Sequence, residues 1–311
     1  MKKHYKGIHH ISIISGDGQT NAEFYVKKLG LRMVLKTVNQ DDPSNYHLFY
    51  ANGAGAPGSS ITFFPWPMAK EGSRGTGTTS RVTFAAPSGS KEFWKTRLQD
   101  LEIEFTEGSD FDTEFISFKD PDNLDLAIFF DSRSDDIPGW DSNGVPKEHS
   151  IRGFWSAELR LVSAEGTARV LKEVMGFSES DKSDNKTLYT TNAPIGHSII
   201  IEEAGKQIEG KNGRGVVHHV AFRAENQENL REMRQKVIDM GLSPTDVIDR
   251  HVFKSVYFMT PGGVLFEIAS DDPGYLSVTD DESKMGSELF LPPWLEKDRE
   301  YIESRLPPIV I

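Results

Sequence analysis

Apolar and polar residues repeat one order along the chain: a strand, an amphipathic helix that ends near a glycine, and several strands that finish in an apolar strand. The order occurs four times, and we number the copies modules 1 to 4. In module 1 it predicts strands at 9–13, 31–37, 46–51 and 60–64, and a helix at 21–29 that stops at Gly30. The chain is therefore predicted to be an α+β protein of four βαβββ modules.

The other three modules follow the same order. Module 2 has a strand at 81–85, a helix at 90–101 and strands at 115–119 and 124–130; module 3 has a strand at 154–162, a helix at 164–175 and strands at 186–191 and 197–202; module 4 has a strand at 218–224, a helix at 227–240 and strands at 255–259 and 264–269. Modules 2 and 4 match best, because the turn Asp-Pro-Asp-Asn at 120–123 aligns with Thr-Pro-Gly-Gly at 260–263. This alignment puts Ala127 where module 4 has Glu267, so the repeat exists without the carboxylate.

The repeat also predicts how the chain is divided. We expect an N-terminal domain at 1–140 with modules at 7–66 and 79–131, a C-terminal domain at 150–271 with modules at 150–204 and 214–271, and a docked tail at 272–311. The Gly-, Ser- and Thr-rich segment 68–79 is interpreted as a linker between modules, and the mixed-charge segment 180–186 as a solvated turn. The tail has three open interpretations: a cover for a pocket, a subunit contact, or packing against its own chain.

Two pairs of adjacent histidines stand out from this pattern. His9 and His10 lie in the first strand of module 1, His218 and His219 lie in the first strand of module 4, and together they are four of nine histidines in the chain. Glu267 lies between two apolar residues in the last strand of module 4. Because an unpaired buried carboxylate is costly, a bound cation would explain its position. Two imidazoles and one carboxylate are a common ligand set for non-haem Fe(II).

Strand geometry indicates which member of each pair is the candidate ligand. Adjacent side chains of a strand point to opposite faces. His9 shares the apolar face of its strand with Ile11, whereas His10 lies on the other face; by the same rule His218 groups with Val220 and Phe222, and His219 with the small residue Ala221. His10, His219 and Glu267 are therefore the predicted ligands. They come from modules 1 and 4, so we expect the outer modules to pair with each other and the inner modules 2 and 3 to do likewise.

Composition narrows the functional class. The chain has 311 residues, enough for two domains, and no cysteine, which excludes disulfides and thiolate metal sites. Its formal charge of 35 − 47 = −12 argues against a nucleic-acid partner. Residues 1–5 carry no apolar leader, and no apolar stretch approaches membrane-spanning length. We therefore expect a cytoplasmic protein with no membrane partner, and a homo-oligomer stays open.

The modules and their motifs resemble a known superfamily. The segments His9-His10-Ile11-Ser12, Val-His-His-Val-Ala-Phe at 217–222 and Gly-Gly-Val-Leu-Phe-Glu at 262–267 are similar to those of the vicinal-oxygen-chelate superfamily, which includes glyoxalases, bleomycin resistance proteins and dioxygenases. Within it, the chain resembles the hydroquinone-specific ring-cleaving dioxygenases over nearly its whole length, including 46–50, 61–65 and 307–311. The resemblance implies two vicinal-oxygen-chelate domains.

The resemblance also implies an activity and roles for single residues. It implies an Fe(II)-dependent extradiol-type dioxygenase that opens hydroquinone-type aromatic rings with O2, with Mn(II) as the alternative metal. The metal would be held by the three ligands named above. Tyr257 would donate a hydrogen bond or proton, Arg250 would neutralise negative charge, and His218 would act as base for the second substrate hydroxyl. His9 and His218 match pocket histidines of the family, but alternation places both behind their strands unless the backbone bulges.

Other interpretations remain at this point. One is a glyoxalase-like, metal-dependent isomerase or lyase, which usually has a fourth protein ligand; no acidic residue of module 1 matches it, since Phe64 or a neighbour ends the last strand there. Another is a metal-free protein that binds aromatic compounds or drugs. Tyr257 is also consistent with simple packing across a sheet, and Arg250 with an exposed loop charge.

Overall fold

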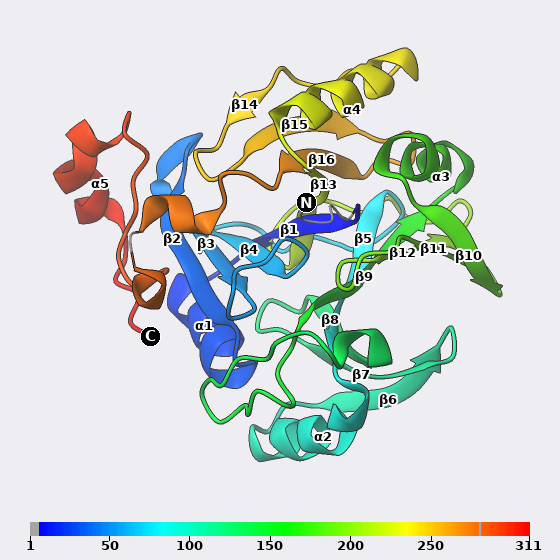
Figure 1. Cartoon of the computed structure of the whole chain (residues 1–311), viewed down its shortest axis with the longest axis horizontal. Coiled ribbons are helices and arrows are strands. Elements are labelled where there is room, and N and C mark those ends of the chain that lie inside the picture. The colour runs from blue at the N-terminus through cyan, green and yellow to red at the C-terminus, as the bar shows by residue number, and fades with distance from the viewer. Residues whose placement is uncertain (1–5, 280) are drawn as a thin grey trace.

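Two sheets organise the fold (Figure 1). The structure is a computed structural model that describes residues 6–279 and 281–311, so the predicted lack of a leader at 1–5 lies outside the described residues. Within the described part, the sheet of the outer modules 1 and 4, which we call the outer sheet, has eight strands in the order β14-β15-β16-β13-β1-β4-β3-β2. The sheet of the inner modules 2 and 3, the inner sheet, also has eight, in the order β10-β11-β12-β9-β5-β8-β7-β6.

The strands divide evenly among the four modules. Module 1 holds β1 (Ile8–Ser15), β2 (Arg32–Asn39), β3 (Asp42–Ala51) and β4 (Ser60–Pro65); module 2 holds β5 (Thr78–Ala86), β6 (Phe105–Asp110), β7 (Thr113–Lys119) and β8 (Asp125–Phe130); module 3 holds β9 (Gly153–Leu161), β10 (Ser178–Ser183), β11 (Lys186–Thr190) and β12 (Ser198–Glu203); module 4 holds β13 (Val216–Ala224), β14 (Ile248–Asp249), β15 (Lys254–Met259) and β16 (Leu265–Ser270).

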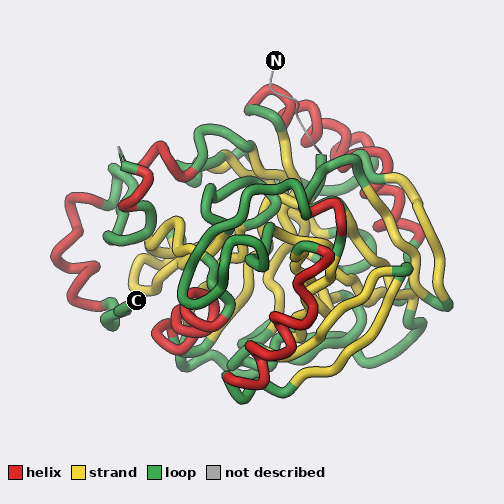
Figure 2. Tube along the Cα trace, turned by 60° about the horizontal axis from the view of Figure 1, so that its bottom comes forward, coloured by secondary structure: helices red, strands yellow, loops and turns green. Residues whose placement is uncertain are grey.

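The helices follow the first strand of each module, and further short helices lie between modules and in the tail. They are α1 (Gly18–Ala22) with the π-helical turn η1 (Glu23–Lys28), α2 (Lys91–Asp100) preceded by η2 (Ser88–Ser90), η3 (Ser132–Ser134), α3 (Glu165–Val170) with the π-helical turn η4 (Leu171–Met175), α4 (Gln227–Asp239), η5 (Tyr275–Val278), η6 (Glu282–Lys284), η7 (Glu296–Asp298) and α5 (Arg299–Arg305). Gly176 follows the third helix with φ of +76°, the left-handed conformation that ends helices and favours glycine. In Figure 2 the helices lie around the outside of the strands.

The predicted pairing of modules is confirmed. Modules 1 and 4 join where β1 runs antiparallel to β13, and modules 2 and 3 join where β5 runs antiparallel to β9. Within a module the first and last strands lie side by side and parallel, as β1 with β4 and β13 with β16. The α+β class and the four βαβββ modules are therefore confirmed. Because each sheet takes strands from both halves of the chain, the division between 140 and 150 stays a prediction.

One local prediction is wrong. The segment 180–186 was expected to be a solvated turn, but β10 pairs with β11 along it and only the tip at 184–185 turns. All six residues of β10 are exposed, because the strand forms one edge of the inner sheet. An exposed edge strand carries polar and charged residues that limit pairing with other chains. Its sequence therefore lacks the apolar alternation by which strands are recognised.

Buried side chains join the two sheets into one core. The phenol of Tyr25 in module 1 donates a hydrogen bond to Asp120 in module 2 at 3.1 Å. Between modules 3 and 4, the rings of Phe177 and Phe222 meet edge to face at 5.8 Å between centroids. The connection 68–79 contains no regular element as far as Gly77, and isolated bridges pair it with the connection between modules 3 and 4.

The tail lies against module 1 and at the edge of the outer sheet (Figure 1). The phenol of Tyr275 donates to Ser60 Oγ at 2.8 Å, and the backbone amide of Phe290 donates to the carbonyl of Lys36 at 2.9 Å. Leu291 and Ile302 are buried with Val38 of β2. The tail thus packs against its own chain and brings Phe290 close to the concave side of the outer sheet.

Candidate metal centre

Two β-bulges shape the strands that carry the histidine pairs. Ile8 and His10 of β1 face Phe222 and Ala221 of β13, so His9 is an extra residue on β1. Farther along the same ladder the extra residue is on β13 and is His218. A bulge re-aims the side chain of the residue that it inserts. Neither histidine therefore lies where simple alternation put it.

The structure brings the three predicted ligands together. Nε2 of His10 and Nε2 of His219 lie 3.2 Å and 2.8 Å from Oε2 of Glu267, and the two nitrogens are 3.4 Å apart. All three residues are buried, with exposed fractions of 1%, 3% and 0%. They form the one group of histidine and acidic residues in the described part of the chain whose ligand atoms converge as a metal site requires. The three side chains therefore form a His-His-Glu group that could hold a metal ion.

The carboxylate of Glu267 is held from one side and open on the other. The hydroxyl of Ser255 donates a hydrogen bond to Oε1. Among the described residues no hydroxyl or amide is directed at Oε2, the oxygen that faces the two imidazoles. Burial opposes ionisation, but the imidazoles of His10 and His219 outweigh it and hold the pKa of Glu267 well below its usual range. A bound cation would neutralise this buried carboxylate and contact the oxygen that no hydroxyl or amide of the described residues reaches.

The second ring nitrogen of each candidate ligand meets the neighbouring histidine. Nδ1 of His10 is 2.9 Å from Nδ1 of His9, and Nδ1 of His219 is 2.8 Å from Nδ1 of His218. Such a partner fixes the tautomer and the orientation of a metal-binding imidazole. Burial lowers the pKa of His218 to about 4, helped by His219, so His218 is neutral at pH 7. A neutral neighbour can accept the Nδ1 proton and leave Nε2 bare for a metal.

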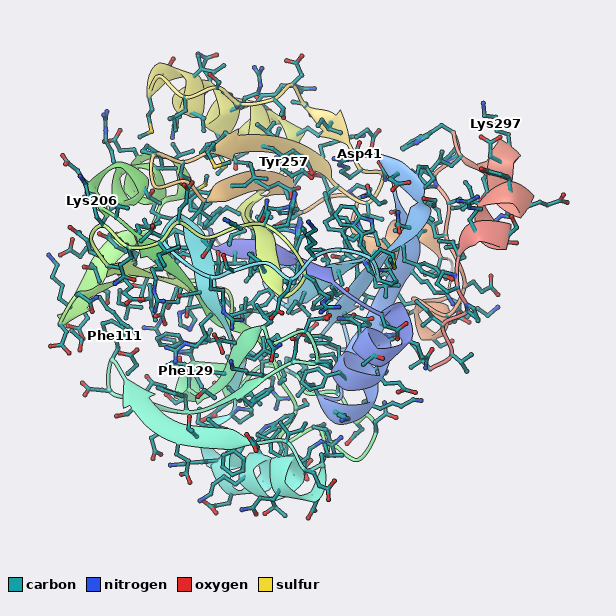
Figure 3. The ribbon with its side chains drawn as sticks, turned by 180° about the vertical axis from the view of Figure 1, so that it is seen from behind. Asp41, Phe111, Phe129, Lys206, Tyr257 and Lys297 are labelled. Atoms are coloured by element: carbon teal, nitrogen blue, oxygen red, sulfur yellow. The ribbon has the colours of Figure 1, made fainter. Side chains whose placement is uncertain are left out.

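Tyr257 and Arg250 also lie at the site. The Tyr257 ring is edge to face with His219 at 5.4 Å between centroids, and the Arg250 guanidinium lies 5.6 Å from the centre of the Tyr257 ring. Burial, together with the charge of Glu267, raises the pKa of Tyr257 above its usual value, so the phenol keeps its proton. Arg250 forms an ion pair with Asp41 at 3.1 Å. Figure 3 shows Tyr257 in the outer sheet and Asp41 at the tip of the neighbouring hairpin.

A cavity of about 40 Å³ is lined by His10 and His219, two of the three predicted ligands. Its walls come from the concave face of the outer sheet, the β2–β3 turn, the segment around Arg250, and Phe290 of the tail. The volume is room for a few water molecules at most. An aromatic ring therefore requires the walls to move, and the Arg250–Asp41 ion pair joins the two segments that stand at its mouth.

Some residues of the pocket were not predicted from the sequence. His47 lines the cavity, and its Nε2 lies 2.8 Å from Oγ1 of Thr62. Burial, with the nearby imidazoles of His10 and His219, lowers the pKa of His47 well below its usual value. In module 1, Thr62 pairs with Ser12, which lies two residues after His10. In module 4, Glu267 pairs with Ala221, which lies two residues after His219. Thr62 is therefore the equivalent of Glu267. Aligning modules 1 and 4 strand by strand would have found both residues.

The inner sheet has no equivalent site. A cleft of about 1180 Å³ lies beside β5 to β9 and is larger than the cavity above. Several of its charged residues are paired, since Arg81 binds Glu158 at 2.8 Å, and Lys186 binds Glu158 at 3.0 Å and the nearby Asp110 at 3.2 Å. Phe129 and Trp155 stack with ring centroids 4.3 Å apart on the concave face of this sheet. The converging ligands, and not the size of the cavity, therefore locate the functional site.

Comparison with known proteins agrees with this geometry. The family model of the Glyoxalase/Bleomycin resistance protein/Dioxygenase superfamily matches residues 7–128 and 159–268. The chain belongs to this superfamily. It is 33% identical to the chlorohydroquinone/hydroquinone 1,2-dioxygenase of Sphingobium indicum, over 100% of this chain and 99% of that protein. It is 37% identical to MhqE of Bacillus subtilis, provisionally named a ring-cleaving dioxygenase, over 97% of this chain and 98% of that one.

Solved structures show the same fold. A crystal structure of a provisionally assigned dioxygenase from Bacillus subtilis matches with a TM-score of 0.93 and 35% identity, over 99% of this chain and 98% of that one. Glyoxalase I from Zea mays matches with a TM-score of 0.63 and 13% identity, over 86% of this chain and 92% of that one, which shows a common fold alone. No helix among the described residues is long and apolar enough to span a bilayer.

Proposed function

We propose that this protein is an Fe(II)-dependent ring-cleaving dioxygenase that opens hydroquinone-type aromatic rings with O2. The observation that carries the proposal is the convergence of buried His10, His219 and Glu267 beside a cavity. Relatives with a ring-cleaving dioxygenase name, including one named for hydroquinone, match over the full length of the chain. The donor set and the relatives thus support the same class of reaction.

The donor set fits the proposed metal. Two imidazole nitrogens and one carboxylate oxygen suit Fe(II), and Mn(II) shares this preference closely enough to be the alternative. When bound, Fe(II) supplies open coordination positions for substrate and O2 and a path for electrons between them. Ser255 holds the carboxylate, and His9 and His218 orient the two imidazoles.

The remaining residues would act on the substrate. Tyr257 keeps its proton and lies against His219, so its phenol is available to donate a hydrogen bond or a proton as the ring opens. Arg250 keeps a positive charge at the mouth of the cavity, where it would stabilise negative charge on the opened ring. The resemblance makes His218 a base for a ring hydroxyl, but its Nδ1 meets His219 and it does not line the cavity, so we propose that this neutral imidazole orients His219 instead.

Glyoxalase-like chemistry is less well supported. Such sites usually have a fourth protein ligand, and the strand-by-strand equivalent of Glu267 in module 1 is Thr62. The Thr62 hydroxyl lies 2.7 Å from Ser12 Oγ and 2.8 Å from His47 Nε2, so other groups occupy it. A metal-free binding protein would have no reason to bury Glu267 between two imidazoles.

Metal analysis and oxygen uptake test the proposal. Protein purified without oxygen should hold one Fe(II) per chain and consume O2 in step with the loss of a hydroquinone, on a panel that also contains catechols. Glu267→Gln removes the anionic ligand and should lower activity by more than the roughly 10- to 100-fold that follows from losing an outer partner of a metal site. Glu225→Gln, which changes an exposed carboxylate of the same module, is the control. Metal-loaded wild type that leaves every hydroquinone intact would overturn the proposal.

A further inference from the structure

Modules 1 and 4 contribute equivalent strands to the site, but the side chains at equivalent positions differ. In module 4, Ser255 stands two residues before Tyr257, which pairs with Glu267. In module 1, His47 stands two residues before Phe49, which pairs with Thr62. Ser255 donates to Glu267, and His47 contacts Thr62 in the same way. At equivalent positions, module 4 thus has Ser255, which holds the carboxylate of Glu267, and module 1 has His47, whose imidazole lines the cavity.

The ring of His47 is held firmly in place. Its Nε2 meets the Thr62 hydroxyl, which in turn meets the hydroxyl of Ser12, and both of these hydroxyl residues are fully buried. The rings of Phe49 and Phe64 lie against it, with centroids 4.0 and 4.2 Å away. Among the described residues no polar atom bonds Nδ1 of His47. The imidazole thus lines the cavity with one nitrogen fixed and one unused.

A second unused polar group lies next to it. Thr37 is directly opposite His47 in the β2–β3 ladder, so the two side chains share one face of the sheet. Thr37 lines the same cavity, is only 5% exposed, and its Oγ1 has no hydrogen-bond partner within the described part of the chain. A buried hydroxyl without a partner costs free energy unless a ligand satisfies it. Two polar groups therefore lie opposite each other in the wall of the cavity.

The strand spacing between His10 and His47 suits the length of a para-disubstituted ring. His47 is on β3, which is two strands from β1 and His10, and two strand spacings are roughly 10 Å. His10 and His47 both line the same cavity. A ring whose first hydroxyl lies at the metal centre would direct a second hydroxyl on its opposite side toward β3.

We propose that His47 and Thr37 bind the second hydroxyl of the substrate, on the side of the ring opposite the metal centre, and so select hydroquinones over phenols that lack it. The inference rests on the proposed function and assigns its specificity to two residues. It moves this contact away from His218, which does not line the cavity and whose Nδ1 is engaged with His219.

Binding measured without oxygen tests the inference. Calorimetry on the metal-loaded protein gives the ratio of the dissociation constants for phenol and hydroquinone. His47→Gln keeps an amide near the position of Nε2 but removes Nδ1, and should reduce this ratio about tenfold, the worth of one buried hydrogen bond. His47→Asn keeps a polar atom near Nδ1 and should retain more of the ratio. Thr37→Val should reduce it about threefold without changing the shape of the side chain.

A matched control separates specificity from stability. Thr79 of β5 is another buried threonine with no partner for its hydroxyl among the described residues, and it lies in the inner sheet. Thr79→Val should leave the ratio unchanged. The inference is wrong if wild type cleaves hydroquinone while Thr37→Val and folded His47 variants keep the wild-type ratio. If wild type neither binds nor cleaves hydroquinone, the proposed function itself fails. Thr37→Val alone decides the matter if the His47 variants do not fold.

Discussion

At the scale of single residues, the charge of Glu267 depends on very few neighbours. The carboxylate is fully buried, and one hydroxyl and two imidazoles surround it. Sequence patterning found these ligands because a polar residue inside an apolar strand is conspicuous. It could not find Ser255 as the partner of Glu267, since that contact crosses two strands that pair only in the folded chain.

Removing the Ser255 hydroxyl should weaken metal binding. Ser255→Ala leaves Oε1 of Glu267 without its donor, so the carboxylate is less well oriented, and we expect metal affinity to fall about 10- to 100-fold. Competition with a chelating indicator measures this affinity. Ser109→Ala, at an exposed serine of β6, should bind metal as wild type does. Equal affinities of Ser255→Ala and wild type would show that the hydrogen bond does not support the site.

A buried carboxyl in the inter-module core should give the protein a distinct pH dependence. Burial raises the pKa of Asp120 to about 6, despite hydrogen bonds from the backbone of Leu124 and from Tyr25. Between pH 4 and 6 the folded state thus binds more protons than the unfolded state, so this group adds stability as pH falls through 6. The gain is full near pH 4 and reaches about 2–3 kcal/mol.

Comparing wild type with Asp120→Asn isolates this contribution, because both proteins share all other titrating groups. Urea unfolding at pH 7 and pH 4.5 gives the two free energies of unfolding. The difference between wild type and Asp120→Asn should shift in favour of wild type at pH 4.5. A difference that stays constant between these pH values would contradict the assignment.

At the scale of elements, the first strands of modules 1 and 4 show where sequence patterning stops. Alternation chose His10 and His219 over their neighbours, and those are the two whose Nε2 atoms meet Glu267. Alternation also put His9 and His218 behind the strands, and there the bulges intervene. A bulge depends on how two distant strands register with each other, so one strand read alone does not reveal it.

The tail segment should control which substrates enter. Phe290 lines the cavity and contacts His251, with ring centroids 4.9 Å apart. Phe290→Ala removes a wall of a cavity that is too small for a ring, so the Michaelis constant for hydroquinones with bulky substituents should fall about tenfold. Steady-state kinetics on substituted hydroquinones measure this. Trp294→Ala, at a neighbouring tail residue that is 45% exposed and does not line the cavity, should change it little. A Phe290→Ala protein with unchanged size selection would show that the tail does not limit entry.

At the scale of the whole molecule, the modules and their pairing were predicted from the sequence, whereas the strands at the edges of the inner sheet were not. The number of modules and their pairing followed from the repeat and from the origin of the ligands, both of which survive in the sequence as strong patterns. The strands β6 and β10 form the two edges of the inner sheet, no residue of either is fully buried, and both carry little apolar alternation. Thr37 became recognisable as a pocket residue only when the β2–β3 ladder set it opposite His47.

Metal binding should stabilise the entire fold. The ligands come from modules at opposite ends of the sequence, so the unfolded chain cannot assemble them, and a metal that binds only the folded state adds about 2.7 kcal/mol at a concentration 100 times its dissociation constant. The thermal midpoint of the metal-free protein should rise by a few degrees when Fe(II) is added without oxygen. Glu267→Gln should show little increase. A rise of equal size in that variant would place the stabilising metal elsewhere.

Under the proposed function, the order of the three proposed ligands along the chain would set when the metal can enter. His10 belongs to the first strand, and Glu267 follows it by 267 − 10 = 257 residues. A nascent polypeptide that ends before β16 contains at most His10 and His219 of the three proposed ligands. It has no Glu267 carboxylate to balance the charge of a bound cation. Binding of the proposed metal would therefore have to follow the synthesis of all the other strands of the two sheets.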